Sequence, residues 1–253
     1  KFPKNKRAID GLKALAGGPV GKASKVQDPT QDQQESVINL YNQGQLQQAL
    51  EQATILLQQF PSSSVLYNIC GAVYKGLGQL DASVEAYSKA LAIKPENAQF
   101  YSNMGAVLQE QGNLQEAIEA YNKALAIKPD YADVYTNMGV TLQEQGKLEE
   151  AIEAYNKALS LQPNDADLHN NMGNALQEQG KLDKAIEAYK KVIALKPDYA
   201  EVYSNMGYAL KGQGKLTEAI VAFNRALSLK PDYADAYNNM GNTLKEQGKL
   251  EEA

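Results

Sequence analysis

The sequence has no tryptophan, one cysteine and one histidine among its 253 residues. A single Cys70 excludes an intramolecular disulfide framework, and Cys70 with His169 leaves too few ligands for a zinc site or a Cys/His nucleophile pair. No apolar run is long enough for a membrane span or for the core of a signal peptide. These absences argue against a secreted disulfide-rich domain, a membrane protein and most metalloenzymes. They predict no cofactor and favour a cytoplasmic location.

Positive charge is scarce beyond the first residues. Residues 1–29 carry seven Lys/Arg and two Asp/Glu, which leaves 18 basic and 28 acidic residues for the rest of the chain. An acidic body without a basic stripe is a poor partner for phosphate backbones. We therefore expect neither a nucleic acid nor a membrane as the partner of the main surface.

What the sequence does contain is an internal repeat. The string Asn-Met-Gly begins at Asn103, Asn137, Asn171, Asn205 and Asn239, so each copy starts 34 positions after the one before. The repeats in this frame are 30–63, 64–97, 98–131, 132–165, 166–199, 200–233 and a truncated 234–253. We expect one array over 30–253, preceded by a linker at 16–29 and, at 1–15, by the tail of an earlier repeat plus a short helix. Both ends look cut from a longer protein.

Each repeat carries the pattern of two helices. In 98–131, apolar residues fall twice at i, i+3, i+4, i+7 spacing. Gly112 lies between the two helices, where a glycine adopts the left-handed conformation without steric cost. Pro129 follows the second helix, and Asp130 is expected to cap the next one. The equivalent caps expected in later repeats are Asn164, Asp198 and Asp232. The pattern predicts an all-α solenoid.

A glycine recurs in the middle of the first helix, where it costs about 1 kcal/mol relative to alanine. We expect Gly105 to let the two helices of its repeat approach closely opposite Ala117, with Tyr121 among the residues that close the gap. The first repeat has Val37 in place of the glycine and Ala53 in place of the aromatic residue. Such departures are typical of a terminal repeat.

The two rare residues fit the same repeat. Cys70 shares its position with Met104, so it is predicted to be a buried apolar filler, not a reactive thiol. His169 replaces the tyrosine found at position 4 of neighbouring repeats, and its ring is expected to pack there.

The repeat resembles the tetratricopeptide repeat (TPR) family, through an aromatic residue at position 4, Gly at 8, Leu or Tyr at 11, Ala at 20, an aromatic at 24, Ala at 27 and Pro at 32. The matching residues of 98–131 are Tyr101, Gly105, Leu108, Ala117, Tyr121, Ala124 and Pro129. The resemblance covers 30–253. It implies an all-α, right-handed superhelical solenoid of helix-turn-helix repeats, which binds a peptide or a partner protein in a concave groove lined by the first helices.

No catalytic constellation is present in the sequence. The segment 17–24 is not a phosphate-binding loop, because Ala16 replaces the first glycine, Ala23 replaces Ser/Thr and no strand precedes it. Carboxylate pairs such as Glu149 and Glu150 lie on exposed helix positions. The chain is predicted not to be an enzyme.

Two rows of polar residues recur on one face of the first helices. Position 6 is Asn in five successive repeats, although Asn is a mediocre helix former that costs roughly 0.5 kcal/mol each time. Position 2, four residues earlier, is acidic from the fourth repeat on. The predicted peptide-binding residues are Asn103, Asn137, Asn171, Asn205, Asn239, Asp133, Asp167, Glu201 and Asp235.

Each row has a structural alternative. The acidic residues stand three places after the expected caps, as Asp133 does after Asp130, which is the spacing of a capping box. The asparagines could form an amide ladder between neighbouring repeats, or be inherited from a duplicated ancestor.

The two rows together, in segments such as ADVYTNMG, ADLHNNMG and ADAYNNMG, resemble the TPR superhelix of O-linked N-acetylglucosamine transferases. The resemblance implies that the asparagines clamp an extended peptide backbone and that Asp133, Asp167 and Asp235 contact its side chains. Glu201 matches less closely, and Glu35 and Ile69 fall outside the pattern. The tail clamp of chaperone-binding TPR proteins is disfavoured, because it needs basic residues at positions 5 and 6.

The sequence therefore predicts a non-enzymatic scaffold that binds an extended peptide or partner segment. With helices about 10 Å apart and a strand rise of about 3.3 Å per residue, five asparagines would span about a dozen peptide residues. We expect weak, roughly micromolar binding that favours basic or hydroxyl-bearing peptides. Two alternatives stay open: the substrate-recruiting arm of a larger transferase, and a structural solenoid that forms homo-oligomers by end-to-end or groove-mediated packing.

Overall fold

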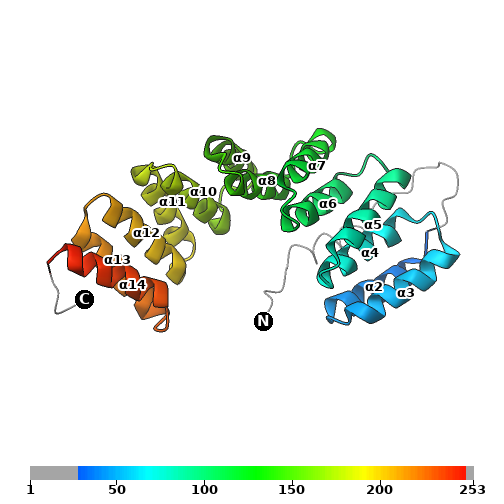
Figure 1. The fold of residues 1–253 in the computed structure, drawn as a ribbon, viewed down its shortest axis with the longest axis horizontal. Coiled ribbons are helices and arrows are strands. Elements are labelled where there is room, and N and C mark those ends of the chain that lie inside the picture. The colour runs from blue at the N-terminus through cyan, green and yellow to red at the C-terminus, as the bar shows by residue number, and fades with distance from the viewer. Residues whose placement is uncertain (1–27, 249–253) are drawn as a thin grey trace. The chain divides into compact units, whose positions relative to one another are not determined.

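The computed structural model describes residues 28–248, which form thirteen α-helices and no strand (Figure 1). The all-α prediction is confirmed for this range. The expected earlier repeat and short helix at 1–15, the linker up to residue 27 and the end of the last repeat at 249–253 lie outside the described residues.

The helices alternate between the two halves of each repeat. The first helices are α2 (Gln31–Asn42), α4 (Ser64–Gly76), α6 (Ala98–Glu110), α8 (Ala132–Glu144), α10 (Ala166–Glu178), α12 (Ala200–Gly212) and α14 (Ala234–Glu246). The second helices are α3 (Leu46–Gln59), α5 (Leu80–Ile93), α7 (Leu114–Ile127), α9 (Leu148–Leu161), α11 (Leu182–Leu195) and α13 (Leu216–Leu229). From the second repeat on, every first helix begins at position 1 of the repeat frame, and every second helix begins at position 17.

The turn inside each repeat depends on glycine, as the sequence predicts. Gly112 has φ of +79°, and the glycines at the equivalent position of the other repeats are also left-handed. After this turn, the Asn113 N–H donates to the Leu108 carbonyl at 2.9 Å. The left-handed glycine thus reverses the chain and lets the next residue bond a terminal carbonyl of the first helix.

The expected helix caps are wrong. The residues that precede α8, α12 and α14 are Tyr131, Tyr199 and Tyr233, and none of them makes a side-chain cap. Only α10 has an acidic cap, and it is Asp165, which accepts from the Leu168 N–H at 3.0 Å. These four helices all begin at position 1 of the repeat, so the capping residue is the last residue of the preceding repeat. The residues predicted as caps, Asp130, Asn164, Asp198 and Asp232, lie one position too early. The position-2 carboxylates are therefore not the partners of a capping box.

The mid-helix glycine makes room for a ring. A Cβ built on Gly105 would lie 2.6 Å from the Tyr121 ring, and one built on Gly139 would lie 2.6 Å from the Tyr155 ring. Tyr121 and Tyr155 are fully buried. The close approach expected at Gly105 exists, but its partner is the aromatic ring of position 24, not the backbone at Ala117. The first repeat has Val37 and Ala53 at these two positions, both fully buried.

The chain divides into two compact units, residues up to Asp130 and residues from Tyr131. The first contains α2–α7 and the second α8–α14, and Figure 1 shows successive antiparallel helix pairs within each. In both units a first helix packs on its own second helix, on the second helix before it and on the neighbouring first helices. Stacking of first helices places equivalent residues 34 positions apart side by side within a unit.

Candidate functional site

The first helices share one polar face, formed by positions 2, 6, 9 and 13 of the repeat. These positions are three or four residues apart, so their side chains project from the same side of a helix. We call this surface the first-helix face and describe it separately in the two units. All nine residues predicted to bind peptide lie on it.

Two of the five asparagines are hydrogen-bonded to the preceding repeat. The Asn103 Nδ2 donates to the Asn68 Oδ1 at 2.9 Å, and the Asn103 Oδ1 accepts from Gln99 at 2.8 Å. The Asn205 Nδ2 donates to the Oδ1 atoms of Asn170 and Asn174, at 3.3 and 3.2 Å. An inter-repeat amide ladder is therefore present at these two positions.

The amides of the other three asparagines are free of hydrogen bonds to the described residues of the second unit. Asn171 and Asn239 are half-buried and make no side-chain hydrogen bond to any residue that the structure describes, and Asn137 makes none within its own unit. The difference follows from position 5 of the preceding repeat. Asn68 and Asn170 stand there before the two bonded asparagines, whereas Thr136 stands there before Asn171, and its hydroxyl donates to the Ala132 carbonyl at 3.0 Å.

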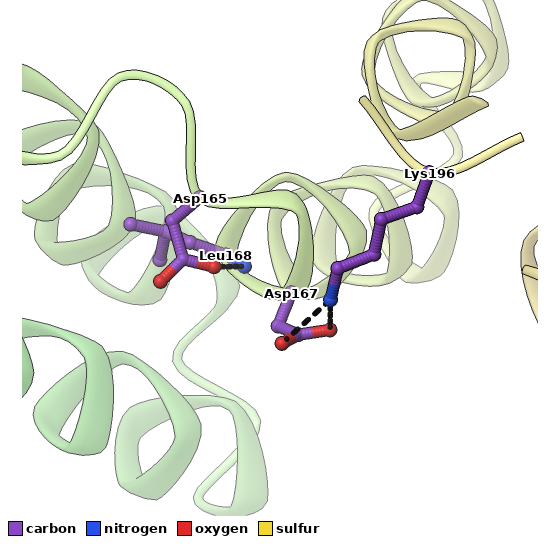
Figure 2. Close-up of polar contacts among 4 residues, drawn as sticks. All are labelled: Asp165, Asp167, Leu168 and Lys196. Atoms are coloured by element: carbon purple, nitrogen blue, oxygen red, sulfur yellow. Dashed lines mark hydrogen bonds and ion pairs between the residues drawn. The ribbon is translucent and has the colours of Figure 1, made fainter. Parts of the chain in front are cut away.

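The acidic row is partly neutralised by lysines. Figure 2 shows Lys196 reaching across to Asp167, with its Nζ 3.1 Å from both carboxylate oxygens, while Asp165 caps the same helix. Lys230 lies 3.4 Å from Glu201 in the same way. Each lysine stands at position 31 of the repeat that holds its carboxylate. Because all four side chains are about half exposed, each pair stabilises the fold by less than about 1 kcal/mol.

Asp133 lacks this lysine. Position 31 of its repeat is Gln162, and Asp133 makes no ion pair within its unit. Asp235 likewise has no ion pair with a residue in the described range. Within the described part of the second unit, the acidic row therefore contains two carboxylates paired with lysines and two without an ion pair.

A pocket of about 330 Å³ opens on the first-helix face between α8 and α10. It is lined by Val140, Gln143, Glu144, Tyr155, Asn171, Asn174 and Glu178. Val140 and the Tyr155 ring are its apolar lining groups, two carboxylates border it, and the side-chain amide of Asn171 can both donate to and accept from an occupant. No lysine or arginine lines this pocket.

The pocket's polar groups are fixed by a chain of hydrogen bonds. The Tyr155 hydroxyl donates to the Gln143 Oε1 at 3.1 Å, and the Gln143 Nε2 donates to Glu178. Burial raises the pKa of Tyr155, and the charges of Glu178 and Glu144 raise that pKa further. The phenol therefore stays protonated and holds Gln143 in one orientation, with its N–H directed at Glu178.

In two other repeats, the position equivalent to Gln143 holds a lysine that pairs with a glutamate of the next repeat. Lys75 at position 12 pairs with Glu110 of the next repeat at 3.3 Å, and Lys211 pairs with Glu246 at 2.8 Å. Sequence reasoning missed positions 9, 12 and 13 of the repeat. The signal available for them was that each lysine stands 35 positions before its glutamate.

The two rare residues are structural. Cys70 is 3% exposed, and burial raises the pKa of its thiol to about 11. His169 is buried with its Nε2 2.9 Å from the Pro163 carbonyl oxygen, and at the equivalent position the Tyr203 hydroxyl donates to the Pro197 carbonyl at 3.1 Å. Both residues occupy the places that the repeat frame predicted for them. Among residues 28–248 there is no group of His, Cys, Asp and Glu that could hold a metal ion, and no helix long and apolar enough to cross a membrane.

Family models of the tetratricopeptide repeat match residues 96–164 and 154–187, and a model described as TPR repeat matches 71–112, 173–214 and 207–248. The matches together run through residues 71–248. The comparison with curated proteins finds no match.

Solved TPR structures share the fold. A MamA crystal structure is 30% identical, with a TM-score of 0.61 over 65% of this chain and 96% of that one. A TPR protein from Parabacteroides merdae is 17% identical, with a TM-score of 0.71 over 87% of each chain. YrrB, described as a TPR protein with an unusual peptide-binding site, is 22% identical, with a TM-score of 0.63 over 74% of this chain and 96% of that one. The chain belongs to the tetratricopeptide repeat family and is a protein-interaction scaffold.

Proposed function

We propose that the first-helix face binds an extended segment of a partner protein, and that the free asparagine amides hydrogen-bond to its backbone. The observation that carries the proposal is Asn171. Its amide is half-buried at an open pocket and makes no hydrogen bond to the described residues, although an asparagine inside a helix costs stability. An amide that donates and accepts suits a peptide group, which does the same.

The asparagine row contains two kinds of residue, because Asn103 and Asn205 are hydrogen-bonded to the preceding repeat and the other three are not. These two amides hold neighbouring repeats together, and Asn137, Asn171 and Asn239 are the residues that bind peptide. Each hydrogen bond contributes about 0.5 to 1.5 kcal/mol net, so three of them with a few side-chain contacts give weak binding that tolerates many sequences. The uncompensated Asp133 and Asp235 contact side chains of the bound segment.

The test is a titration of fluorescently labelled, unstructured peptides, each long enough in extended form to cross the asparagine row, into matched variants. The free-amide variant carries Asn137→Ala, Asn171→Ala and Asn239→Ala, and the control variant carries Asn103→Ala and Asn205→Ala. We expect the free-amide variant to lose binding at least tenfold, with an unfolding free energy equal to or higher than that of the full chain, because alanine is the better helix former. The control variant loses stability by about 1 kcal/mol or more and still binds. Binding that survives in the free-amide variant contradicts the proposal.

A further inference from the structure

The slot between positions 12 and 13 of consecutive first helices is a place where this protein repeatedly puts a cation. Between α4 and α6 the Lys75 ammonium occupies it and pairs with Glu110, and between α12 and α14 the Lys211 ammonium occupies it and pairs with Glu246. Both glutamates stand at position 13, and both lysines stand 35 positions earlier. In both of these slots, the partner of the position-13 glutamate is therefore a lysine ammonium.

The slot between α8 and α10 keeps the glutamate and lacks the lysine. Gln143 takes the lysine's position and gives Glu178 one neutral N–H, and the Tyr155 hydroxyl holds Gln143 in that orientation. Glu144 adds a second carboxylate at the rim, whereas the equivalent residue of both lysine-filled slots is a glycine, Gly76 or Gly212. This slot thus has two glutamates where each lysine-filled equivalent has one, and no lysine or arginine is among the residues that line it.

The same slot is open, and its walls suit a long basic side chain. The pocket of about 330 Å³ is lined by Val140, against which a methylene stem can pack, and by Asn171. At the next slot along, between α10 and α12, position 13 is Gly212, so the glutamate of the other slots is missing there. The combination of cavity, unmatched glutamate and free asparagine therefore occurs at the α8–α10 slot and not at the other three slots just compared.

We propose that the α8–α10 pocket binds the cationic side chain of a lysine or arginine in the bound segment, with Glu178 as its direct partner and Glu144 adding to the field. The partner's side chain replaces the lysine that Lys75 and Lys211 supply at the equivalent slots. This inference rests on the proposed function, since it names the side chain that the peptide-binding face selects. It makes Glu178 a specificity-determining residue.

The test uses three unstructured Ser/Ala-rich peptides of equal length that differ only at one central position, which holds Lys, Arg or Gln. Affinities are measured by fluorescence anisotropy at low and at high salt for the full chain and for Glu178→Gln, Gln143→Lys and Glu246→Gln. Gln143→Lys supplies the internal lysine already tolerated at positions 75 and 211, so it is expected to fold. Glu246→Gln removes a matched glutamate that already has its lysine.

The full chain is expected to bind the Lys and Arg peptides about three- to fivefold more tightly than the Gln peptide at low salt, and less selectively at high salt. The preference disappears in Glu178→Gln and in Gln143→Lys, and persists in Glu246→Gln. Equal binding of the Gln and Lys peptides to the full chain overturns this inference and leaves the proposed function standing. A preference that persists in Gln143→Lys also overturns it, because the cation is then bound elsewhere. If no peptide binds, the proposed function fails and this inference fails with it.

Discussion

Positions 8 and 24 of the repeat share one volume in the core. Where position 8 is glycine, an aromatic ring from position 24 fills the space, as Phe223 does against Gly207, and a Cβ on Gly207 would lie 2.7 Å from that ring. In the first repeat the larger side chain is at position 8 and the smaller one at position 24, as Val37 and Ala53, and both are fully buried. The first repeat departs from the pattern at both positions and still has a filled core. Close packing constrains the total volume of the two side chains and not the volume of each one.

The exchange can be made in the repeat of residues 200–233. Gly207→Val alone is expected to lower the unfolding free energy by about 2 to 3 kcal/mol through overpacking, and Phe223→Ala alone by about 3 to 5 kcal/mol through the cavity it leaves. In the double variant, the loss of unfolding free energy is expected to be smaller than the sum of the two single losses by at least about 1.5 kcal/mol. Denaturant unfolding of the four proteins measures this coupling. Losses that add within about 0.5 kcal/mol, as those of independent sites do, would show that the two side chains do not share one space.

The residues of the site could be predicted only in part. The repeat period places all nine predicted residues on the first-helix face, because a helical period fixes the direction of a side chain. It does not tell which amides are already bonded, since Asn205 depends on Asn170 and Asn174 of another repeat. The repeats are near copies at position 6 and differ at positions 5 and 12, and those differences decide which asparagines and glutamates are free.

At the scale of the helix, the sequence predicts the two helices of each repeat and the turn between them better than the residue at which each first helix begins. Apolar periodicity and the left-handed glycines determine where each hairpin turns. The cap was misplaced because Asp198 and Asn164 are residue types that cap helices, and propensity alone favours them. Stacking against the preceding second helix instead starts each first helix at the same position, so Asp165 caps α10 and Tyr199 precedes α12 without a cap.

The two acidic residues before these helices should therefore differ in effect. Asp165→Ala removes the hydrogen bond to the Leu168 N–H and is expected to lower the unfolding free energy by about 1 kcal/mol. Asp198→Ala, its neighbour in the next repeat, is expected to change that free energy by less than about 0.5 kcal/mol, because Asp198 caps nothing. Urea unfolding of both variants under the same conditions compares them. Equal losses would mean that Asp198 caps α12 in solution.

At the scale of the whole molecule, both units bury weak acids. In the first, burial raises the pKa of Tyr87 and raises that of Cys70 to about 11. In the second, burial raises the pKa of Tyr155 and of Tyr189. Each of these groups keeps its proton in the folded state at a pH where the unfolded chain loses it. The unfolded state then binds fewer protons, so stability falls as pH rises through this range.

One part of this alkaline loss of stability can be assigned to Cys70. Between pH 9 and 11, Cys70 alone is expected to lower the unfolding free energy by on the order of 2 kcal/mol, because its thiol ionises near 9.0 when unfolded and near 11 when folded. Guanidinium unfolding at pH 8, 9, 10 and 11 gives the slope, which should be shallower in Cys70→Ala at every pH above 9. The slopes are compared, not the absolute values, since the substitution also removes buried atoms. Identical slopes would place the thiol in water.

The central claim is that the first-helix face binds an extended segment through the asparagine amides that the fold leaves free. The most direct measurement is an NMR titration that follows the side-chain amide signals of asparagine as an unstructured peptide with one central lysine is added. We predict saturable shifts of the Asn171, Asn137 and Asn239 signals at one common affinity, and little change at Asn103 and Asn205, whose amides are already bonded. Shifts confined to the second helices, or of equal size at Asn205 and Asn171, would contradict it.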